Sequence, residues 1–316
     1  MLGIGKLMST GQTSSTDRRL SWLALLGEGS ARIGDALGGD RVQEARWIVE
    51  RVSGYNANEL RLNETELVSA RSVSFFDALV ARRCRKEPLQ YVLGRWQFRY
   101  LELVIDRNVL IPRPETEIVA GIAIDAAKAV VAERKRQGSG TAVRVLDLGT
   151  GSGAIALSVT TEVPQTLVWA TDSSLGALSV ARANLAGLGR AATRVTMLEG
   201  NWFGALSDDL RASFSVIVSN PPYVAESERV HLTSDVLDWE PQSALFASDE
   251  GRSDIAVILE EAHHWLEPGG ILVIEMAPHQ TAWAAAMAAT KQYVDVAISK
   301  DLAGRDRALV AKVALQ

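Results

Sequence analysis

The second half of the chain alternates short apolar runs with helical segments, and this alternation constrains the fold more than any other feature. Strands are expected at residues 143–148, 167–172, 195–198, 214–219, 271–276, 293–299 and 308–313, and helices at 154–160, 175–185, 255–266 and 282–289. Strands separated by helices form a parallel sheet that is covered on both faces. The last two strands are joined by a short loop and must be antiparallel to each other. The sequence therefore predicts an α/β fold with a mixed seven-stranded sheet and helices on both faces.

The first part of the chain has a helical pattern instead. Residues 1–16 are rich in Gly, Ser and Thr and are interpreted as a flexible lead-in. Residues 17–88 are expected to form a small all-helical domain, in which one helix begins at Asn63 because acidic residues follow it. Residues 89–112 contain alternating aromatic and β-branched positions and are expected to form a connecting β-hairpin. The sheet domain then spans residues 113–316.

The charge balance argues against a protein that binds polyanions without sequence preference. The 316 residues carry 33 basic and 38 acidic side chains, a net charge of −5. Residues 1–90 hold 13 basic and 11 acidic side chains and residues 91–316 hold 20 and 27, so neither part has the clustered Lys and Arg that neutralise phosphates. The single cysteine, Cys84, forms neither an intrachain disulfide nor a Cys-based zinc site. The sequence shows no signal-peptide pattern and no run of about 18 apolar residues. We therefore expect a metal-free, cytoplasmic protein that does not enter a membrane.

A glycine-rich loop follows the first strand of the predicted sheet. Glycine lets the backbone turn sharply and approach a ligand closely, and ligands of such sheets bind beyond the carboxyl ends of the strands. The spacing is G-x-G-x-G, not the G-x-G-x-x-G of dinucleotide sites, and it resembles the S-adenosylmethionine loop of class I methyltransferases. An ordinary strand-to-helix turn is the alternative. The residues expected to bind the methionine part of the cofactor are Gly149, Thr150, Gly151, Ser152 and Gly153.

Polar and aromatic residues also follow the next two strands. Asp172 ends the second strand, 25 residues after Asp147, and a carboxylate at this position can accept hydrogen bonds from both ribose hydroxyls. The alternative role of Asp172 is a helix N-cap. Trp202 follows the third strand, where it is expected to stack on the adenine, with Asn201 at the adenine edge; a core position is the alternative for Trp202.

The sequence Asn220-Pro221-Pro222-Tyr223 follows the fourth strand. Two prolines cannot donate hydrogen bonds to a neighbouring strand, so the strand must end here. This leaves the Asn220 side chain and free carbonyl groups beside the cofactor loop. An amide nitrogen is a poor nucleophile because its lone pair is conjugated, but two acceptors can hold its two hydrogens and direct the nitrogen at a methyl group. We expect these acceptors to be Asn220 Oδ1 and the Pro221 carbonyl, with Pro222 and Tyr223 lining the substrate site. The alternative is a strand-end turn.

Taken together, the sequence resembles the release factor glutamine methyltransferases, the HemK/PrmC family. The similarity covers nearly the whole chain and includes residues 44–50, 87–94 and 110–117, the glycine loop, Asp172, Trp202, residues 220–223 and residues 304–307. The segment Ile111-Pro112-Arg113-Pro114-Glu115-Thr116-Glu117 is the most specific part, because generic amino-methyltransferases lack it.

The resemblance implies a Rossmann-like class I methyltransferase domain at 113–316 and a substrate-docking helical domain at 17–88. It implies that the methyl group of S-adenosylmethionine is transferred to the side-chain nitrogen of the glutamine in the Gly-Gly-Gln motif of peptide-chain release factors, leaving S-adenosylhomocysteine. Asn220 would then border both cofactor and substrate. We expect a monomer without a stable nucleic-acid partner.

Two other functions use the same motifs. An adenine-N6 methyltransferase of DNA or RNA would apply the Asn-Pro-Pro-Tyr chemistry to a flipped base, although such an enzyme needs a basic track. A catalytically silent binding module would use the fold as a scaffold only. We expect the segment Arg113–Glu117 to lie over the cofactor pocket, and the roles of Arg113, Glu117 and Glu240 are left open.

Overall fold

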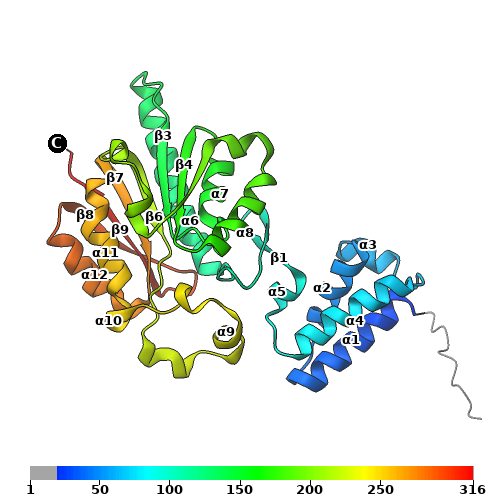
Figure 1. The fold of residues 1–316 in the computed structure, drawn as a ribbon. Coiled ribbons are helices and arrows are strands. Elements are labelled where there is room, and N and C mark those ends of the chain that lie inside the picture. Colours follow the sequence, from blue (N-terminus) through cyan, green and yellow to red (C-terminus); the bar gives the residue numbers. More distant parts are fainter. Residues whose placement is uncertain (1–19, 316) are drawn as a thin grey trace, which may run out of the picture. The chain divides into compact units, whose positions relative to one another are not determined.

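A computed structural model describes residues 20–315 of the chain. The predicted lead-in, residues 1–16, lies outside the described residues. The chain divides into two compact units, residues 1–85 and residues 86–316 (Figure 1). Among the described residues, no helix combines the length and the apolar character that a membrane crossing requires.

The first unit consists of helices that bury one apolar face each. These are α1 (Trp22–Leu37), α2 (Val42–Ser53), α3 (Ala57–Leu62) and α4 (Ala70–Cys84). Ile33 of α1, Ile48 of α2 and Phe76 of α4 are fully buried. Gly29 allows the close approach of α1 and α4, because a Cβ atom there would lie 2.8 Å from the Phe76 ring. The helices are also joined by an ion pair between Arg83 Nε and Glu44 Oε2 at 2.6 Å.

The predicted helix start at Asn63 is wrong. Asn63 lies at the C-terminal end of α3, where its Nδ2 donates to the Glu59 carbonyl at 2.8 Å. The N-cap of α3 is Asn56, which forms a capping box with Glu59, and the N-cap of α4 is Ser69. Asparagine is suited to either end of a helix, so the acidic residues after Asn63 gave a misleading signal.

The second unit opens with a short helix and a hairpin. Helix α5 (Leu89–Leu93) precedes strands β1 (Arg95–Phe98) and β2 (Leu101–Val104), which pair antiparallel. The hairpin contacts the rest of the unit through Arg99, whose guanidinium donates to both carboxylate oxygens of Glu162 at 2.7 and 2.9 Å. Because bidentate pairs of this kind have a fixed geometry, the hairpin is held in a defined place beside the sheet.

The predicted mixed seven-stranded sheet is confirmed. Its strands are β3 (Val143–Leu148), β4 (Thr166–Asp172), β5 (Val195–Glu199), β6 (Phe214–Ser219), β7 (Leu266–Glu275), β8 (Tyr293–Lys300) and β9 (Asp306–Val313). They are arranged in the order β5-β4-β3-β6-β7-β9-β8. The pairs among β3 to β7 are parallel, whereas β9 is antiparallel to both β7 and β8. The carboxyl ends of β3, β4, β5 and β6 therefore meet at one edge.

Helices cover both faces of this sheet. On one face lie α6 (Pro114–Arg136), α7 (Ala154–Glu162) and α8 (Leu175–Ala186), and on the other lie α11 (Ser253–Glu261) and α12 (Thr281–Ala289) (Figure 1). Strand β3 contributes to both cores, since Val145 packs on the first face and Leu146 on the second. Two short helices, α9 (Ser234–Trp239) and α10 (Ser248–Gly251), lie in the long connection after β6.

Several boundaries in this unit differ from the sequence prediction: residues 89–93, expected in the connecting hairpin, form α5, and the largest shift is at β7. The helix expected at 255–266 ends at Glu261, and β7 already begins at Leu266. The run Pro268–Gly270, which the sequence pattern predicts to be a break before the strand, lies inside β7, and a shift in the β6–β7 register accommodates it. Helix α6 was not predicted at all, although Pro114 at its first turn and basic residues in its last turn are typical of helix ends.

Candidate active site

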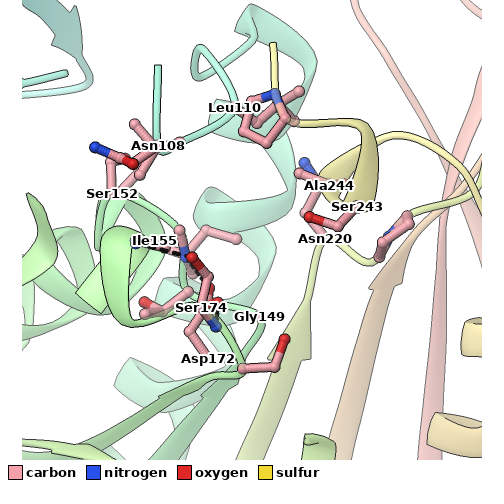
Figure 2. Close-up of a pocket in the computed structure, with 18 of the residues that line it drawn as sticks. Asn108, Leu110, Gly149, Ser152, Ile155, Asp172, Ser174, Asn220, Ser243 and Ala244 are labelled. Carbon is pink, nitrogen blue, oxygen red and sulfur yellow. Dashed lines mark hydrogen bonds between the residues drawn. The ribbon is translucent and has the colours of Figure 1, made fainter. Parts of the chain in front are cut away.

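A pocket opens at the carboxyl edge of the sheet, beyond β3, β4, β5 and β6. Figure 2 shows Asp172 and Ser174 on one side of it and Asn220 with Ser243 on the other. The structure brings together most of the residues that the sequence singled out. Those that line the pocket are Gly149, Thr150, Gly151, Ser152, Asp172, Asn201, Trp202, Asn220 and Pro222. The pocket lining does not include Gly153, Pro221 or Tyr223.

The glycine loop has the backbone conformation that only glycine adopts easily. Gly149, Gly151 and Gly153 have φ values of 68°, 56° and 83°. A Cβ atom on Gly153 would lie 3.0 Å from the Leu157 side chain, so this residue shapes the start of α7 and does not face the pocket. The loop is also tied to α8, because Asn184 Nδ2 donates to the Ser152 carbonyl at 2.9 Å. The loop is thus held in place by α8, while Gly149 and Gly151 line the pocket, where a ligand can reach them.

Asp147 supports this loop from inside the protein. Its carboxylate oxygen Oδ2 accepts hydrogen bonds from Thr150 Oγ1 at 2.6 Å and from the Ala156 amide at 3.1 Å, while Oδ1 has no partner among the described residues. Burial raises the pKa of Asp147 to about 7, and the two hydrogen bonds oppose this shift. The ionised form is therefore costly in the folded protein at neutral pH.

Replacing Asp147 with asparagine should change the pH dependence of stability. The pKa of Asp147 is higher in the folded protein than the value of 3.8 for a free side chain, so the folded state binds the extra proton and wild-type stability falls as pH rises from about 4 to 7. An asparagine at this position cannot titrate. The free energy of unfolding of Asp147→Asn, relative to wild type, should rise by roughly 2–4 kcal/mol over this range. Urea unfolding at pH 5 and pH 8 measures it; a difference that does not change with pH would contradict the assignment.

Asp172 ends β4 and holds the glycine loop from the other side. Its Oδ2 accepts from the Gly151 amide at 2.8 Å, and its Oδ1 accepts from the Ser174 amide at 2.8 Å. The N-cap of α8 is Ser174, whose hydroxyl accepts from Ala177 N, so Asp172 does not have that alternative role. Burial raises the pKa of Asp172, although the two backbone hydrogen bonds oppose this. A carboxylate has about four acceptor positions, and the two that remain can face a ligand.

Trp202 follows β5 and lies beside the end of β4, where its carbonyl accepts a hydrogen bond from Thr171 Oγ1 at 3.3 Å. Its backbone has a φ of 48°, which is unusual for a residue with a side chain. Its ring packs against Gly149, since a Cβ atom added to Gly149 would lie 3.4 Å from the indole ring of Trp202. A hydrogen bond from the Trp202 side chain lowers the pKa of Asp254, which burial raises. Trp202 also packs partly against the second core. The ring is therefore fixed in place while part of it faces the pocket.

Asn220 follows β6 and has a defined hydrogen-bond partner. Its Nδ2 donates to Thr116 Oγ1 in the first turn of α6, at 3.1 Å, and its Oδ1 has no hydrogen-bond donor among the described residues. Tyr223 is turned away, toward the end of β7, where its hydroxyl hydrogen-bonds with Glu275 Oε1 at 3.4 Å. Burial raises the pKa of the Tyr223 hydroxyl. The packing of Tyr223 on a planar substrate group therefore stays a prediction, and its visible role is behind the pocket.

Two further segments complete the pocket, and the sequence predicts only part of the first, since Arg113–Glu117 is expected to lie over the pocket and Thr116 lines it. They contribute Asn108, Val109, Leu110, Pro112 and Thr116 from one side, and Pro241, Ser243 and Ala244 from the other. Glu240, buried and 4% exposed, connects them: its Oε1 accepts from Arg113 Nη2 at 2.5 Å, and its Oε2 from the Ile111 amide at 3.2 Å. The sequence leaves the roles of Arg113 and Glu240 open, and the structure shows that the two side chains pair with each other. Glu117 is not on the pocket lining.

The chain is similar to known proteins over most of its length. A family model described as the PrmC N-terminal domain matches residues 24–94, and one described as the methyltransferase small domain matches residues 118–240. The release factor glutamine methyltransferase of Burkholderia pseudomallei is 37% identical over 84% of this chain and 90% of its own length. The enzyme of the same name from Xylella fastidiosa (strain Temecula1) is 39% identical over 78% of this chain and 83% of its own.

Among solved structures, the catalytic domain of hMettl16, in complex with the MAT2A 3′UTR hairpin 6, has a similar fold. It superposes with a TM-score of 0.50 at 12% identity, over 85% of this chain and 92% of that chain. At 12% identity, this similarity supports the fold and gives no information on function.

Proposed function

The chain belongs to the release factor glutamine methyltransferases, and from that premise we propose how its own residues carry out their reaction. The enzyme transfers a methyl group from S-adenosylmethionine to the side-chain amide nitrogen, N5, of the glutamine in the Gly-Gly-Gln motif of peptide-chain release factors. The observation that carries the mechanism is the position of Asn220, whose Oδ1 accepts no hydrogen bond within residues 20–315, on the same pocket as the glycine loop and Asp172.

The residues of the pocket fit the cofactor. The glycine loop presents a backbone without side chains at Gly149 and Gly151, which suits the methionine part. Asp172 retains acceptor positions for the ribose hydroxyls, and Trp202 offers a ring face for the adenine. When bound, S-adenosylmethionine supplies a methyl group on a positively charged sulfur, which is a strong electrophile. Thr150, Ser152 and Gly153 complete and support the loop.

The protein contributes position and polarity to the chemical step. Asn220 Oδ1 and the Pro221 carbonyl accept the two N–H groups of the substrate amide and fix its nitrogen toward the methyl group. As the new N–C bond forms, the S–C bond breaks, and the nitrogen then releases one proton to water. Acceptors aligned before the reaction lower its barrier without a metal or a strong base. Pro222 closes the pocket beside Asn220.

The helical unit gives the enzyme a second place to contact its large substrate. Most of the PrmC N-terminal domain match, residues 24–94, falls in this unit, which has a well-packed core, but its residues do not contribute to the described pocket. We propose that it docks the body of the release factor, that the enzyme acts in the cytoplasm, and that it works as a monomer without a stable nucleic-acid partner.

Transfer of radiolabelled methyl groups to a panel of acceptors tests this function. We expect labelling of a purified release factor, and none of the same factor with its Gly-Gly-Gln glutamine replaced by asparagine, because the shorter side chain cannot bring its amide to Asn220. DNA and RNA should accept no label, which separates this function from adenine-N6 methylation. A short Gly-Gly-Gln peptide should require a higher concentration than the whole factor because it lacks the docking contacts. Labelling of the asparagine variant at the wild-type rate would contradict the proposal.

A further inference from the structure

A series of interacting polar side chains runs behind the pocket, away from the cofactor loop. It begins at Asn220, whose Nδ2 donates to Thr116 Oγ1 at 3.1 Å. The Thr116 hydroxyl lies beside the carboxylate of Glu275 and lowers its pKa, against the larger effect of burial, and Glu275 Oε1 accepts from the Tyr223 hydroxyl at 3.4 Å. Four segments of the second unit meet here: the end of β6, the loop after it, the first turn of α6 and the end of β7.

The groups in this series are buried. Thr116 is 4% exposed and Glu275 is 1% exposed. A buried carboxylate is costly unless hydrogen bonds and opposite charges stabilise it. Arg307 of β9 and the hydroxyls of Thr116 and Tyr223 lower the pKa of Glu275, while burial, the largest effect, and Glu115 raise it. Apolar side chains in place of buried ionic groups are often as stable or more so, so packing alone does not require a carboxylate here.

The polarity of the series follows from the hydrogen-bonding capacity of each group. An ionised carboxylate only accepts hydrogen bonds, so a Thr116 hydroxyl that interacts with Glu275 turns its hydrogen toward that carboxylate. The Thr116 oxygen is then available only as an acceptor toward Asn220. An acceptor at that point selects the NH2 end of the Asn220 amide, and the carbonyl end must turn toward the pocket. Without this partner the two ends of an amide, which have nearly the same shape, would compete for the same position.

We propose that Thr116, held by Glu275, is a positioning residue that turns the Asn220 side chain so that its oxygen faces the substrate amide. This inference rests on the proposed function, because only a substrate that donates hydrogens to Asn220 requires the amide to point one way. An amide in the opposite orientation would present an NH2 group to the NH2 of the glutamine, and the two donors would repel each other.

Substitutions at Thr116 test this role. Thr116→Val keeps the shape and removes the hydroxyl, and it should lower the single-turnover rate about tenfold, the equivalent of one lost side-chain hydrogen bond. Thr116→Ser restores the hydroxyl and should return the rate to within about threefold of wild type. Because Thr116 also lines the pocket, cofactor affinity is measured for both variants, and the single-turnover rates are compared at saturating cofactor. Equal rates in Thr116→Val and Thr116→Ser would overturn the proposal.

A double-mutant cycle separates positioning from a structural effect. In an Asn220→Ala background no amide remains to be oriented, so adding Thr116→Val should lower the rate by less than about twofold. If Thr116→Val lowers the rate tenfold in both backgrounds, Thr116 acts independently of Asn220 and the proposal is wrong. Failure of the proposed function looks different, because the wild-type enzyme and Thr116→Ser would then both leave the release factor unmethylated.

The pH profile gives a second readout. Glu275 is expected to orient Thr116 only when ionised, and burial raises its pKa to about 7. The single-turnover rate of wild type should therefore fall as the pH decreases through 7. The glutamine in Glu275→Gln cannot titrate. The single-turnover rate of this variant should therefore be lower than that of wild type and should not show the fall as the pH decreases through 7. The neighbouring Glu115, Arg307 and Tyr223 remain in both proteins, as does Asp147, so the difference between the two profiles reports Glu275. The same fall in Glu275→Gln would contradict the role of the Glu275 carboxylate.

Discussion

Replacing Asn220 with alanine is expected to lower the single-turnover rate of methyl transfer by about 100- to 1,000-fold. The substrate amide would lose one of its two acceptors, and a displacement on the order of 1 Å can lower a rate about 100-fold. The cofactor loop and Asp172 do not depend on the Asn220 side chain, so cofactor affinity should change little. Rapid-quench measurement with saturating cofactor and release factor isolates the chemical step.

Asn220→Asp is the matched control. A carboxylate of the same size keeps an acceptor oxygen but removes the Nδ2 hydrogens that Thr116 accepts, and it adds a negative charge near the sulfonium. Its rate should lie between those of wild type and the alanine variant. A wild-type rate in Asn220→Ala would show that the Asn-Pro-Pro-Tyr segment is not the reaction centre.

Replacing Asp172 with alanine is expected to weaken cofactor binding about 10- to 100-fold. The change removes hydrogen bonds to a charged group, each worth roughly 1.5–3 kcal/mol, and it also frees the Gly151 amide that the carboxylate holds at 2.8 Å. Both effects act in the same direction, since a looser loop also binds less well. Isothermal titration calorimetry of S-adenosylmethionine binding measures the change.

The neighbouring strand provides a control for Asp172. Glu199 ends β5 and is paired with Asp172 in the sheet register, but it is exposed and does not line the pocket. Glu199→Ala removes the same charge from the same edge of the sheet and should leave cofactor affinity unchanged. Equal dissociation constants for Asp172→Ala and wild type would remove Asp172 from the cofactor site.

The fold of the second unit was largely predictable because its signals are local. Each parallel strand is buried on both faces and appears in the sequence as a short apolar run, as in Val143–Leu148. The β7 boundary was missed because Pro268–Gly270 usually ends an element, and only the register shift against β6 lets the strand continue. Helix α6 was missed because its apolar residues are not confined to one face, so periodicity gives little signal.

The site was predictable where residues follow strands and unpredictable elsewhere. The carboxyl ends of parallel strands meet at one edge, so Gly149, Asp172 and Asn220 had to lie close together. Thr116 is 104 positions from Asn220 in the sequence, and only the packing of α6 beside β6 brings them within 3.1 Å. The acidic residue Glu240 similarly reaches Arg113 across 127 positions. No local pattern encodes such pairs.

Locating the transferred methyl group tests the central claim most directly. The enzyme is incubated with S-adenosylmethionine and a release factor, and the digested factor is sequenced by tandem mass spectrometry. The account predicts one added methyl group on the side chain of the glutamine in the Gly-Gly-Gln motif, formed by the wild-type enzyme and nearly absent with Asn220→Ala. A methyl group on any other residue, or an unmodified glutamine in the presence of cofactor-bound enzyme, would contradict it.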